Sequence, residues 1–394
     1  MRRLNEIQAA LADEQLDGWL LYDFKGLNPI ALSVAGVPEG RFLTRRWACF
    51  IPARGAPRWL VHGIEAGGMR DLAPEAATYV SWRSWTEGLR TLAGDAQRIA
   101  MEVSPGCAIP YISRVDAGTV ELVRSLGLEV VTSADLVQVA EAVWTPEQLA
   151  SHRRAAATLI GIMGETFEHV RGRLAADERV TECGVQDYMM RLFADRGLET
   201  DHPPIVAVNA HGADPHFAPQ RDADTELHWG DYLLIDMWGR EIGPENIMGD
   251  ITWVAFAGRE VPRRGQEIFD LVKAARDRAV AFARERLQAG QTVYGYEVDD
   301  ACRDVIRAAG LADYFFHRTG HSIGTVGHGN GVNIDNLETQ DRRRLLPGVG
   351  FSVEPGIYLA HEGFGVRLEI DCYVNGNDVE VTTLPLQDAW VLLG

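Results

Sequence analysis

Two strand-like runs decide the fold of the C-terminal part of this chain: Asp231-Tyr232-Leu233-Leu234-Ile235-Asp236-Met237-Trp238 and Gly249-Asp250-Ile251-Thr252-Trp253-Val254-Ala255-Phe256. Gly243-Pro244 between them is a turn signal, so the runs are predicted to pair as a β-hairpin. With the turn centred on Gly243, Asp236 and Asp250 are equidistant from it and are predicted to lie opposite each other on one face. Because like charges opposed in a sheet repel each other, this pair calls for a cation.

A second hairpin repeats this arrangement of carboxylates. Residues 350–358 lead through a turn at His361-Glu362 into residues 365–371. Centred on that turn, the hairpin is predicted to set Glu354 against Glu369. Both hairpins are therefore expected to present a pair of acidic side chains on otherwise apolar strands.

A segment rich in glycine and histidine, residues 317–328, lies between the hairpins and contains His321. Four carboxylates and one imidazole can hold two divalent cations, with Asp250 and Glu369 bridging them, and two-metal sites activate water for attack on a carbonyl group. Oxygen ligands with one nitrogen suit manganese, cobalt, iron or zinc better than calcium. A single aspartate or histidine is usually a capping or packing residue, so the prediction depends on the set as a whole.

The N-terminal part has a different pattern, in which helical stretches alternate with short strand-like runs at residues 19–22, 48–51, 59–62 and 98–103. This alternation predicts an α/β domain. Thr145 followed by Pro146 predicts the cap and first residue of a long helix that reaches about residue 175. We place the domain boundary just before this helix, which gives domains of residues 1–142 and 143–394. Further helices are predicted near residues 181–196, 264–288 and 295–309.

The composition is typical of a soluble enzyme. The 394 residues include 38 Lys and Arg against 56 Asp and Glu, and the net charge of −18 repels nucleic acid and anionic lipid surfaces. We therefore expect neither nucleic acid nor a membrane as a partner. The cysteines lie far apart and form no paired motif, so we predict no disulfide framework and a cytoplasmic location: Cys49, Cys107, Cys183, Cys302 and Cys372.

The acidic and histidine motifs, taken in order, have a familiar combination. Asp236, Asp250 and residues 320–324, 354–358 and 366–369 resemble the metallopeptidase family that includes aminopeptidase P, prolidase and methionine aminopeptidase. The resemblance implies an α+β fold in which a pita-bread catalytic domain follows a smaller α/β, creatinase-like N-terminal domain. Methionine aminopeptidases lack that first domain, so the proline-specific members are the better match.

The resemblance also implies roles for individual residues. It implies two bound divalent ions, with manganese favoured over cobalt, zinc or iron, and a homodimer. His216 matches the histidine that lines the substrate cleft, and His328 matches the one that contacts the scissile carbonyl. Glu354 is expected both to bind metal and to carry a proton to the leaving nitrogen. The implied metal ligands are Asp236, Asp250, His321, Glu354 and Glu369.

Three departures from the family pattern affect the cleft. The two aspartates are 14 residues apart, which is wider than the usual gap, and Trp253 stands where arginine is common. Gln340 occupies the position where prolidases carry an arginine that clamps the substrate carboxylate. Arg343, within the run Arg342-Arg343-Arg344, is expected to substitute for it, although a solvated face remains an alternative for this run.

The favoured function is hydrolysis of the Xaa-Pro bond, as in an Xaa-Pro dipeptidase. Arg367 is expected to contact substrate, and Tyr358, Phe217 or Phe364 to form a flat wall for proline. Aminopeptidase P activity on longer Xaa-Pro-Yaa peptides is the main alternative. A non-peptidase hydrolase or lyase on the same scaffold, and a binding module without activity, are less favoured because all five ligand positions are retained.

Overall fold

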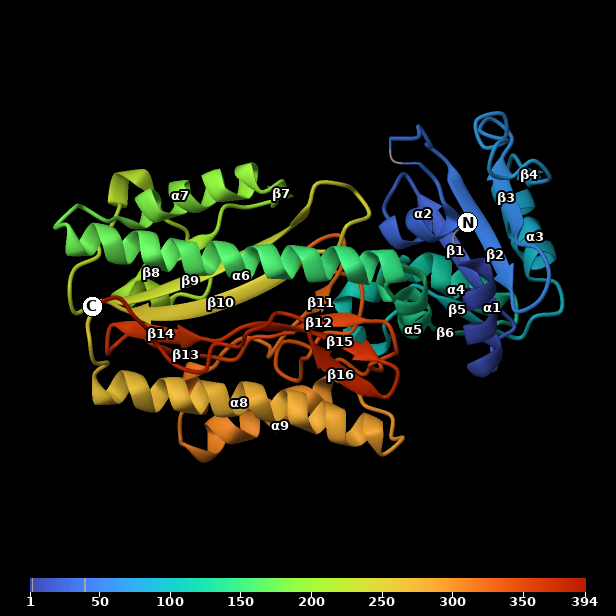
Figure 1. Ribbon diagram of the computed structural model, residues 1–394. Coiled ribbons are helices and arrows are strands. Elements are labelled where there is room, and N and C mark those ends of the chain that lie inside the picture. The colour runs from blue at the N-terminus through green and yellow to red at the C-terminus, as the bar shows by residue number, and fades with distance from the viewer. Residues whose placement is uncertain (2, 39) are drawn as a thin grey trace. The chain divides into compact units, whose positions relative to one another are not determined.

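The computed structural model describes residues 1, 3–38 and 40–394. The chain divides into two compact units, Met1–Glu141 and Ala142–Gly394, and both combine helices with strands (Figure 1). The boundary predicted between residues 142 and 143 lies one residue from this division. Within the described residues, no helix is both long and apolar enough to cross a membrane.

The N-terminal unit is built on one mixed sheet. Its strands are β1 (Gly18–Phe24), β2 (Arg46–Pro52), β3 (Arg58–His62), β4 (Ala77–Tyr79), β5 (Arg98–Met101) and β6 (Glu129–Thr132). Its helices are α1 (Leu4–Asp13), α2 (Pro29–Ala35), α3 (Trp82–Ala93), α4 (Ala117–Ser125) and α5 (Ala134–Val137). The strand order is β4-β3-β2-β1-β5-β6, with β1 antiparallel to β2 and parallel to β5.

Both faces of this sheet are covered. Trp19 and Leu21 of β1 enter one apolar cluster, and Leu20 and Tyr22 enter another. Successive side chains of a strand point to opposite faces, so this alternation requires packing on each side. The predicted strand-like runs are thus observed as β1, β2, β3 and β5, in an α/β arrangement.

The C-terminal unit carries longer helices and several small sheets. Its helices are α6 (Pro146–Ala175), α7 (Glu182–Asp195), α8 (Arg263–Gln288) and α9 (Gly295–Ala308). Its strands are β7 (Leu198–Glu199), β8 (Ile205–Val208), β9 (Tyr232–Glu241), β10 (Gly249–Phe256), β11 (Ser322–Ile323), β12 (Gly350–Val353), β13 (Gly356–Leu359), β14 (Phe364–Arg367), β15 (Ile370–Asn375), β16 (Asp378–Val381) and β17 (Val391–Leu392).

Helix α6 begins where the sequence predicts. The Thr145 side chain accepts a hydrogen bond from the Gln148 backbone N–H, the Gln148 side chain bonds back to Thr145, and Pro146 is the first helical residue. This capping box satisfies backbone donors that have no partner within the helix. The observed bounds of α7, α8 and α9 agree with the predicted helices to within two residues.

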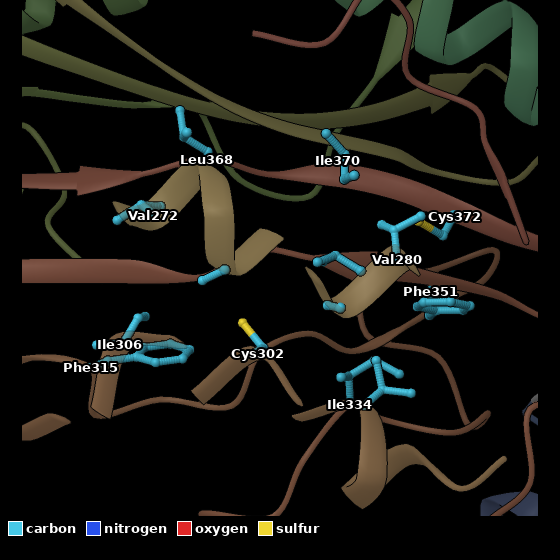
Figure 2. Packing of buried hydrophobic residues seen from close by; sticks show 14 of the residues in the cluster. Val272, Val280, Cys302, Ile306, Phe315, Ile334, Phe351, Leu368, Ile370 and Cys372 are labelled. Carbon is cyan, nitrogen blue, oxygen red and sulfur yellow. The ribbon is translucent and has the colours of Figure 1, made fainter. Parts of the chain in front are cut away.

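The strands of the C-terminal unit lie between two helical layers, with α6 and α7 on one side and α8 and α9 on the other (Figure 1). Figure 2 shows part of the packing on the second side, where Val272 and Val280 of α8 belong to the same buried apolar cluster as Leu368, Ile370 and Cys372. Apolar burial on both sides fixes the strands between rigid helices. This is the pita-bread architecture, and it holds the acidic residues in the middle of the unit.

The first hairpin pairs in a register different from the predicted one. Asp236 of β9 lies opposite Thr252 of β10, and Asp250 lies opposite Trp238. The pairing is therefore centred on Pro244 and not on Gly243. Moving the centre by one residue moves the partner by two, so the prediction of direct opposition is wrong but the two aspartates keep a common face.

The second hairpin pairs as predicted. Its two ladders, β13 with β14 and β12 with β15, share a single register centred between His361 and Glu362. Glu354 and Glu369 occupy opposing positions in that register, at a break between the two ladders. The backbone N–H groups at this break bond elsewhere: Glu354 donates to the Thr319 carbonyl at 2.7 Å and Glu369 donates to the Thr252 carbonyl at 3.1 Å.

Candidate metal and active site

The structure brings the five expected metal ligands to one buried place. Asp236 and Asp250 come from the paired strands β9 and β10, and His321 directly precedes β11. Glu354 and Glu369 come from the break in the second hairpin. All are buried except Glu354, which is half-buried.

The imidazole of His321 faces the carboxylates. Ligand atoms of Asp250, His321 and Glu369 all lie within 4.8 Å of one another. The Nε2 atom of His321 is 3.6 Å from an Asp250 oxygen and 3.4 Å from a Glu354 oxygen. Its Nδ1 lies 3.2 Å from the Ser322 carbonyl, which accepts the Nδ1 proton and leaves Nε2 as the atom with a free lone pair. The ring is thus oriented as a metal ligand.

The cluster contains carboxylate oxygens without hydrogen-bond partners and acidic groups that repel one another. Asp236 Oδ1 and Asp250 Oδ1 are buried and have no hydrogen-bond partner. Burial and the nearby carboxylates of Glu369 and Asp236 raise the pKa of Asp250 well above its usual value, and burial raises that of Glu369 in the same direction. Orphaned acceptors among mutually repelling acids are what a divalent cation would satisfy, so these residues fit the implied metal.

Arg367 and Tyr358 lie next to the expected ligands and are buried, with only 3% and 2% of their surfaces exposed. Arg367 Nη2 is 2.6 Å from Asp236 Oδ2, its Nε donates to Thr252 Oγ1 at 3.1 Å, and its Nη1 donates to the Tyr358 hydroxyl at 3.0 Å. Thr252 in turn donates to Glu369 Oε2 at 2.8 Å. These bonds hold Asp236 and Glu369 in place, whereas direct contact with substrate was expected of Arg367 and Tyr358.

The Tyr358 hydroxyl has a second hydrogen-bond partner, the half-buried imidazole of His317. His317 Nδ1 lies 2.7 Å from the Arg318 carbonyl and so donates to it, which makes Nε2, 2.7 Å from the Tyr358 oxygen, the acceptor. Burial lowers the pKa of His317 to about 3, and burial raises that of Tyr358 to about 12. Both groups are therefore neutral near pH 7. The Tyr358 hydroxyl donates its proton to His317 Nε2, and this hydrogen bond fixes the direction of the hydroxyl.

Arg343 lies in a buried ion pair and not on an open cleft wall. It is 1% exposed, its Nη2 is 2.5 Å from Asp341 Oδ2, and its Nη1 donates to the Asn330 carbonyl at 2.9 Å. This geometry does not support the expected clamp on a substrate carboxylate. The neighbouring Arg342 is exposed and donates to the Gln340 side chain at 2.8 Å.

The two expected cleft histidines are solvent-accessible, as groups that meet substrate must be. The His328 ring lies 4.1 Å from the His321 ring between centroids. His216 lies on an exposed loop, and the Arg367 guanidinium donates at 3.4 Å to the carbonyl of the preceding residue, Pro215. That bond ties the His216 loop to the metal cluster.

Of the aromatic residues expected to form a wall, only Phe217 retains an accessible ring. Phe364 is buried and stacks on Tyr232, with ring centroids 4.6 Å apart. Phe217 stacks on His211 at 4.1 Å. Phe316 was not expected, yet it is 53% exposed and its ring lies 5.3 Å from that of Tyr358.

Several residues that support the ligands were not predicted from the sequence. Thr252 lies directly across the strand pair from Asp236, a position that the mistaken register concealed. Asp371 follows Glu369 by two residues and so shares its strand face; it accepts a hydrogen bond from the Asp250 backbone at 2.8 Å. Strand periodicity was the signal that could have identified Asp371.

This chain is similar to known peptidases. The model of metallopeptidase family M24 matches residues 150–376. The chain is 29% identical over 374 residues to the probable dipeptidase PepE of Mycobacterium tuberculosis H37Rv, covering 93% of this chain and 90% of the relative.

Solved structures share the fold over both units. The dipeptidase PepE of Mycobacterium ulcerans superposes with a TM-score of 0.67 at 22% identity, covering 100% of this chain and 97% of the other. The Xaa-Pro dipeptidase of Bacillus anthracis gives 0.59 at 20% identity, with coverages of 99% and 98%.

Proposed function

Because this chain belongs to metallopeptidase family M24, we propose that it hydrolyses the bond between an N-terminal residue and a following proline, with Xaa-Pro dipeptides as the favoured substrates. The chain is a peptidase of that family. The observation that supports metal-dependent chemistry is the buried group of Asp250, His321 and Glu369, with the orphaned oxygens of Asp236 and Asp250 beside it.

The proposal assigns two divalent ions, manganese first and cobalt, zinc or iron as alternatives, to Asp236, Asp250, His321, Glu354 and Glu369. When bound, the ions would polarise the scissile carbonyl and lower the pKa of water. Two ions are supported by the ligand set, because four carboxylates that ionise on binding metal would place about four negative charges in a largely buried volume.

Glu354 is proposed to carry a proton to the leaving nitrogen. In the chain without metal, burial raises its pKa to about 7, and a carboxylate within reach of water and substrate can accept a proton and pass it on. Ser352 donates a hydrogen bond to its Oε1 at 3.2 Å, which orients the carboxylate toward His321. The partial exposure of Glu354 gives it access to water and substrate.

His328 and His216 are proposed to bind the substrate. His328 would donate a hydrogen bond to the carbonyl oxygen as negative charge develops there, and His216 would hold the peptide backbone. The exposed Phe316 and the half-buried Phe217 offer ring surface for proline, a role for which the buried Tyr358 and Phe364 are less suited.

The preference for dipeptides is supported by the printed names of the similar proteins, a probable dipeptidase and an Xaa-Pro dipeptidase. The burial of Arg343 weighs toward the alternative, an aminopeptidase P that accepts longer peptides. The homodimer and the cytoplasmic location remain predictions.

Product analysis of the full chain tests these assignments. Metal-stripped protein, reconstituted with manganese, cobalt, zinc or iron, is incubated with an Xaa-Pro dipeptide, an Xaa-Pro-Yaa tripeptide and a matched Xaa-Ala dipeptide. We expect free proline from the dipeptide only after reconstitution, and little cleavage of the alanine control. Full activity without metal would contradict the mechanism. Faster cleavage of the tripeptide would assign the chain as an aminopeptidase P with the same site residues.

A further inference from the structure

A buried arginine, Arg318, stands behind the cleft histidine His328. Arg318 is 8% exposed, and its Nη2 lies 3.2 Å from His328 Nδ1. His328 is solvent-accessible and packs its ring against that of His321. The solvent-accessible His328 is thus hydrogen-bonded to the buried Arg318.

The chemistry of this contact fixes where the histidine proton resides. A guanidinium has five N–H donors and no acceptor, so His328 Nδ1 must accept the hydrogen bond and carries no proton. A neutral imidazole with a bare Nδ1 has its proton on Nε2. His328 therefore presents an N–H donor on the side away from Arg318.

We propose that Arg318 is a positioning residue that selects the Nε2–H tautomer of His328 and aims this donor at the carbonyl oxygen of the substrate. This inference rests on the proposed function for the identity of the acceptor. It deepens that function by making His328 a hydrogen-bond donor in the ground state, which leaves Glu354 to accept the proton from water.

The backbone around Arg318 is pinned on both sides. Its own N–H donates to Glu338 Oε1 at 3.0 Å, and its carbonyl accepts from His317 Nδ1 at 2.7 Å. The next residue, Thr319, donates its N–H to the buried carboxylate of Asp299 at 3.0 Å. These bonds restrict the position from which the guanidinium reaches His328, so the donor is organised before substrate arrives.

Nitrogen NMR tests the tautomer without reference to activity. The full chain is labelled with ¹⁵N-histidine and loaded with zinc, which is diamagnetic, and His328→Gln assigns the signals. We expect the Nε2–H tautomer of His328 in the parent protein and a loss of that preference in Arg318→Met. An Nδ1–H tautomer in the parent, or an unchanged tautomer in Arg318→Met, would overturn the inference.

Kinetics test the positioning role. Arg318→Met should lower kcat on an Xaa-Pro dipeptide about tenfold or more, the range typical of partners that orient a site residue, with KM and metal content near those of the parent. Arg318→Lys, which keeps a cationic donor, should recover part of the loss. In a His328→Ala background, Arg318→Met should cause no further loss of kcat.

If Arg318→Met lowered kcat by the same factor in the parent and in the His328→Ala variant, Arg318 would act through another residue, and the proposal would be overturned. A parent protein that fails to cleave any Xaa-Pro peptide would instead reject the proposed function. The NMR result would then still decide whether Arg318 sets the tautomer of His328.

Discussion

Arg367 Nη2 lies 2.6 Å from Asp236 Oδ2, so one expected metal ligand is already held by a buried guanidinium through one oxygen and keeps the other oxygen without a partner. The same guanidinium bonds Thr252, which bonds Glu369. Two ligands on different hairpins are therefore oriented through one arginine. Outer groups of this kind set the geometry and affinity of metal sites.

Replacing Arg367 with lysine should weaken metal binding while the chain stays folded. We expect Arg367→Lys to lower metal affinity about tenfold or more, because a single ammonium cannot serve Asp236, Thr252 and Tyr358 together. Metal titration followed by elemental analysis measures the change. Arg264→Lys, in an exposed ion pair with Glu362, is the matched control and should bind metal as the parent does. Unchanged affinity in Arg367→Lys would contradict this role.

Asp250→Asn should be among the most damaging changes to the site. A carboxylate oxygen of Asp250 lies within 4.8 Å of ligand atoms of both His321 and Glu369, so one cation could contact all three residues. The amide oxygen of asparagine carries no negative charge to offset that of a cation. Elemental analysis of the reconstituted parent should give about two ions per chain, with substantially fewer in the variant. Asp270→Asn, exposed on α8, controls for the loss of one negative charge. Near-normal metal content and turnover in Asp250→Asn would remove this residue from the site.

Glu354→Gln should abolish most turnover while the fold persists. The amide keeps the shape of the side chain and can bond Ser352, but it cannot accept a proton and binds metal poorly. Stopped-flow or end-point assays of proline release measure turnover, and circular dichroism checks the fold. A variant that folds, holds metal and keeps parental kcat would refute the assignment of proton transfer to Glu354.

Arg343→Met should change stability and not substrate length. Removing one partner of a buried ion pair leaves the Asp341 charge uncompensated, at a cost of about 3 to 5 kcal/mol in the free energy of unfolding. Urea denaturation measures this cost, and the adjacent exposed Arg342→Met should cost far less. The ratio of kcat/KM for dipeptide and tripeptide should remain the same in both variants. A selective loss of dipeptide cleavage in Arg343→Met would restore the clamp first expected of it.

The N-terminal unit should lose stability as pH rises, because of Glu102. This buried carboxylate accepts hydrogen bonds from the Trp19 indole and from Asn28 Nδ2, the latter at 2.6 Å, and burial raises its pKa to about 7. An unfolded glutamate titrates near its usual, lower pKa, so the folded state binds the extra proton between the two values. The unfolding free energy therefore falls as pH rises through about 7, by up to about 3 kcal/mol.

Thermal unfolding of the parent and of Glu102→Gln between pH 5 and pH 8 isolates this contribution. The parent should lose more stability across the interval than the variant, whose amide does not titrate. Glu121→Gln, exposed on α4, should follow the parent. Parallel pH profiles for the parent and Glu102→Gln would show that the Glu102 pKa is not raised.

The sequence predicted the secondary structure, and the clustering of the acidic residues with His321, better than the contacts around them. Thr145 and Pro146 mark the start of α6 through local capping chemistry, which a sequence displays directly. The partner of Asp236 was misplaced because Gly243 and Pro244 are both turn residues, and only the folded chain shows which one is the centre. Face periodicity still kept the two aspartates together.

Contacts between residues distant in space could not be predicted in the same way. The run Arg342-Arg343-Arg344 gives no sign that one guanidinium is buried against Asp341 while its neighbour is exposed. Likewise, Arg318 lies within the segment rich in glycine and histidine, but its contact with His328 depends on a loop that returns ten residues later. Such pairs depend on tertiary packing.

At the break in the second hairpin, the main chain and the side chains of Glu354 and Glu369 make different contacts. Their N–H groups are used to join neighbouring strands and loops, through the carbonyls of Thr319 and Thr252, while their carboxylates remain available for a cation. These residues thus form a seam of backbone hydrogen bonds that does not depend on the identity of their side chains. A library that varies the side chains here would retain the scaffold, whereas proline at position 369 would remove an N–H and open the seam.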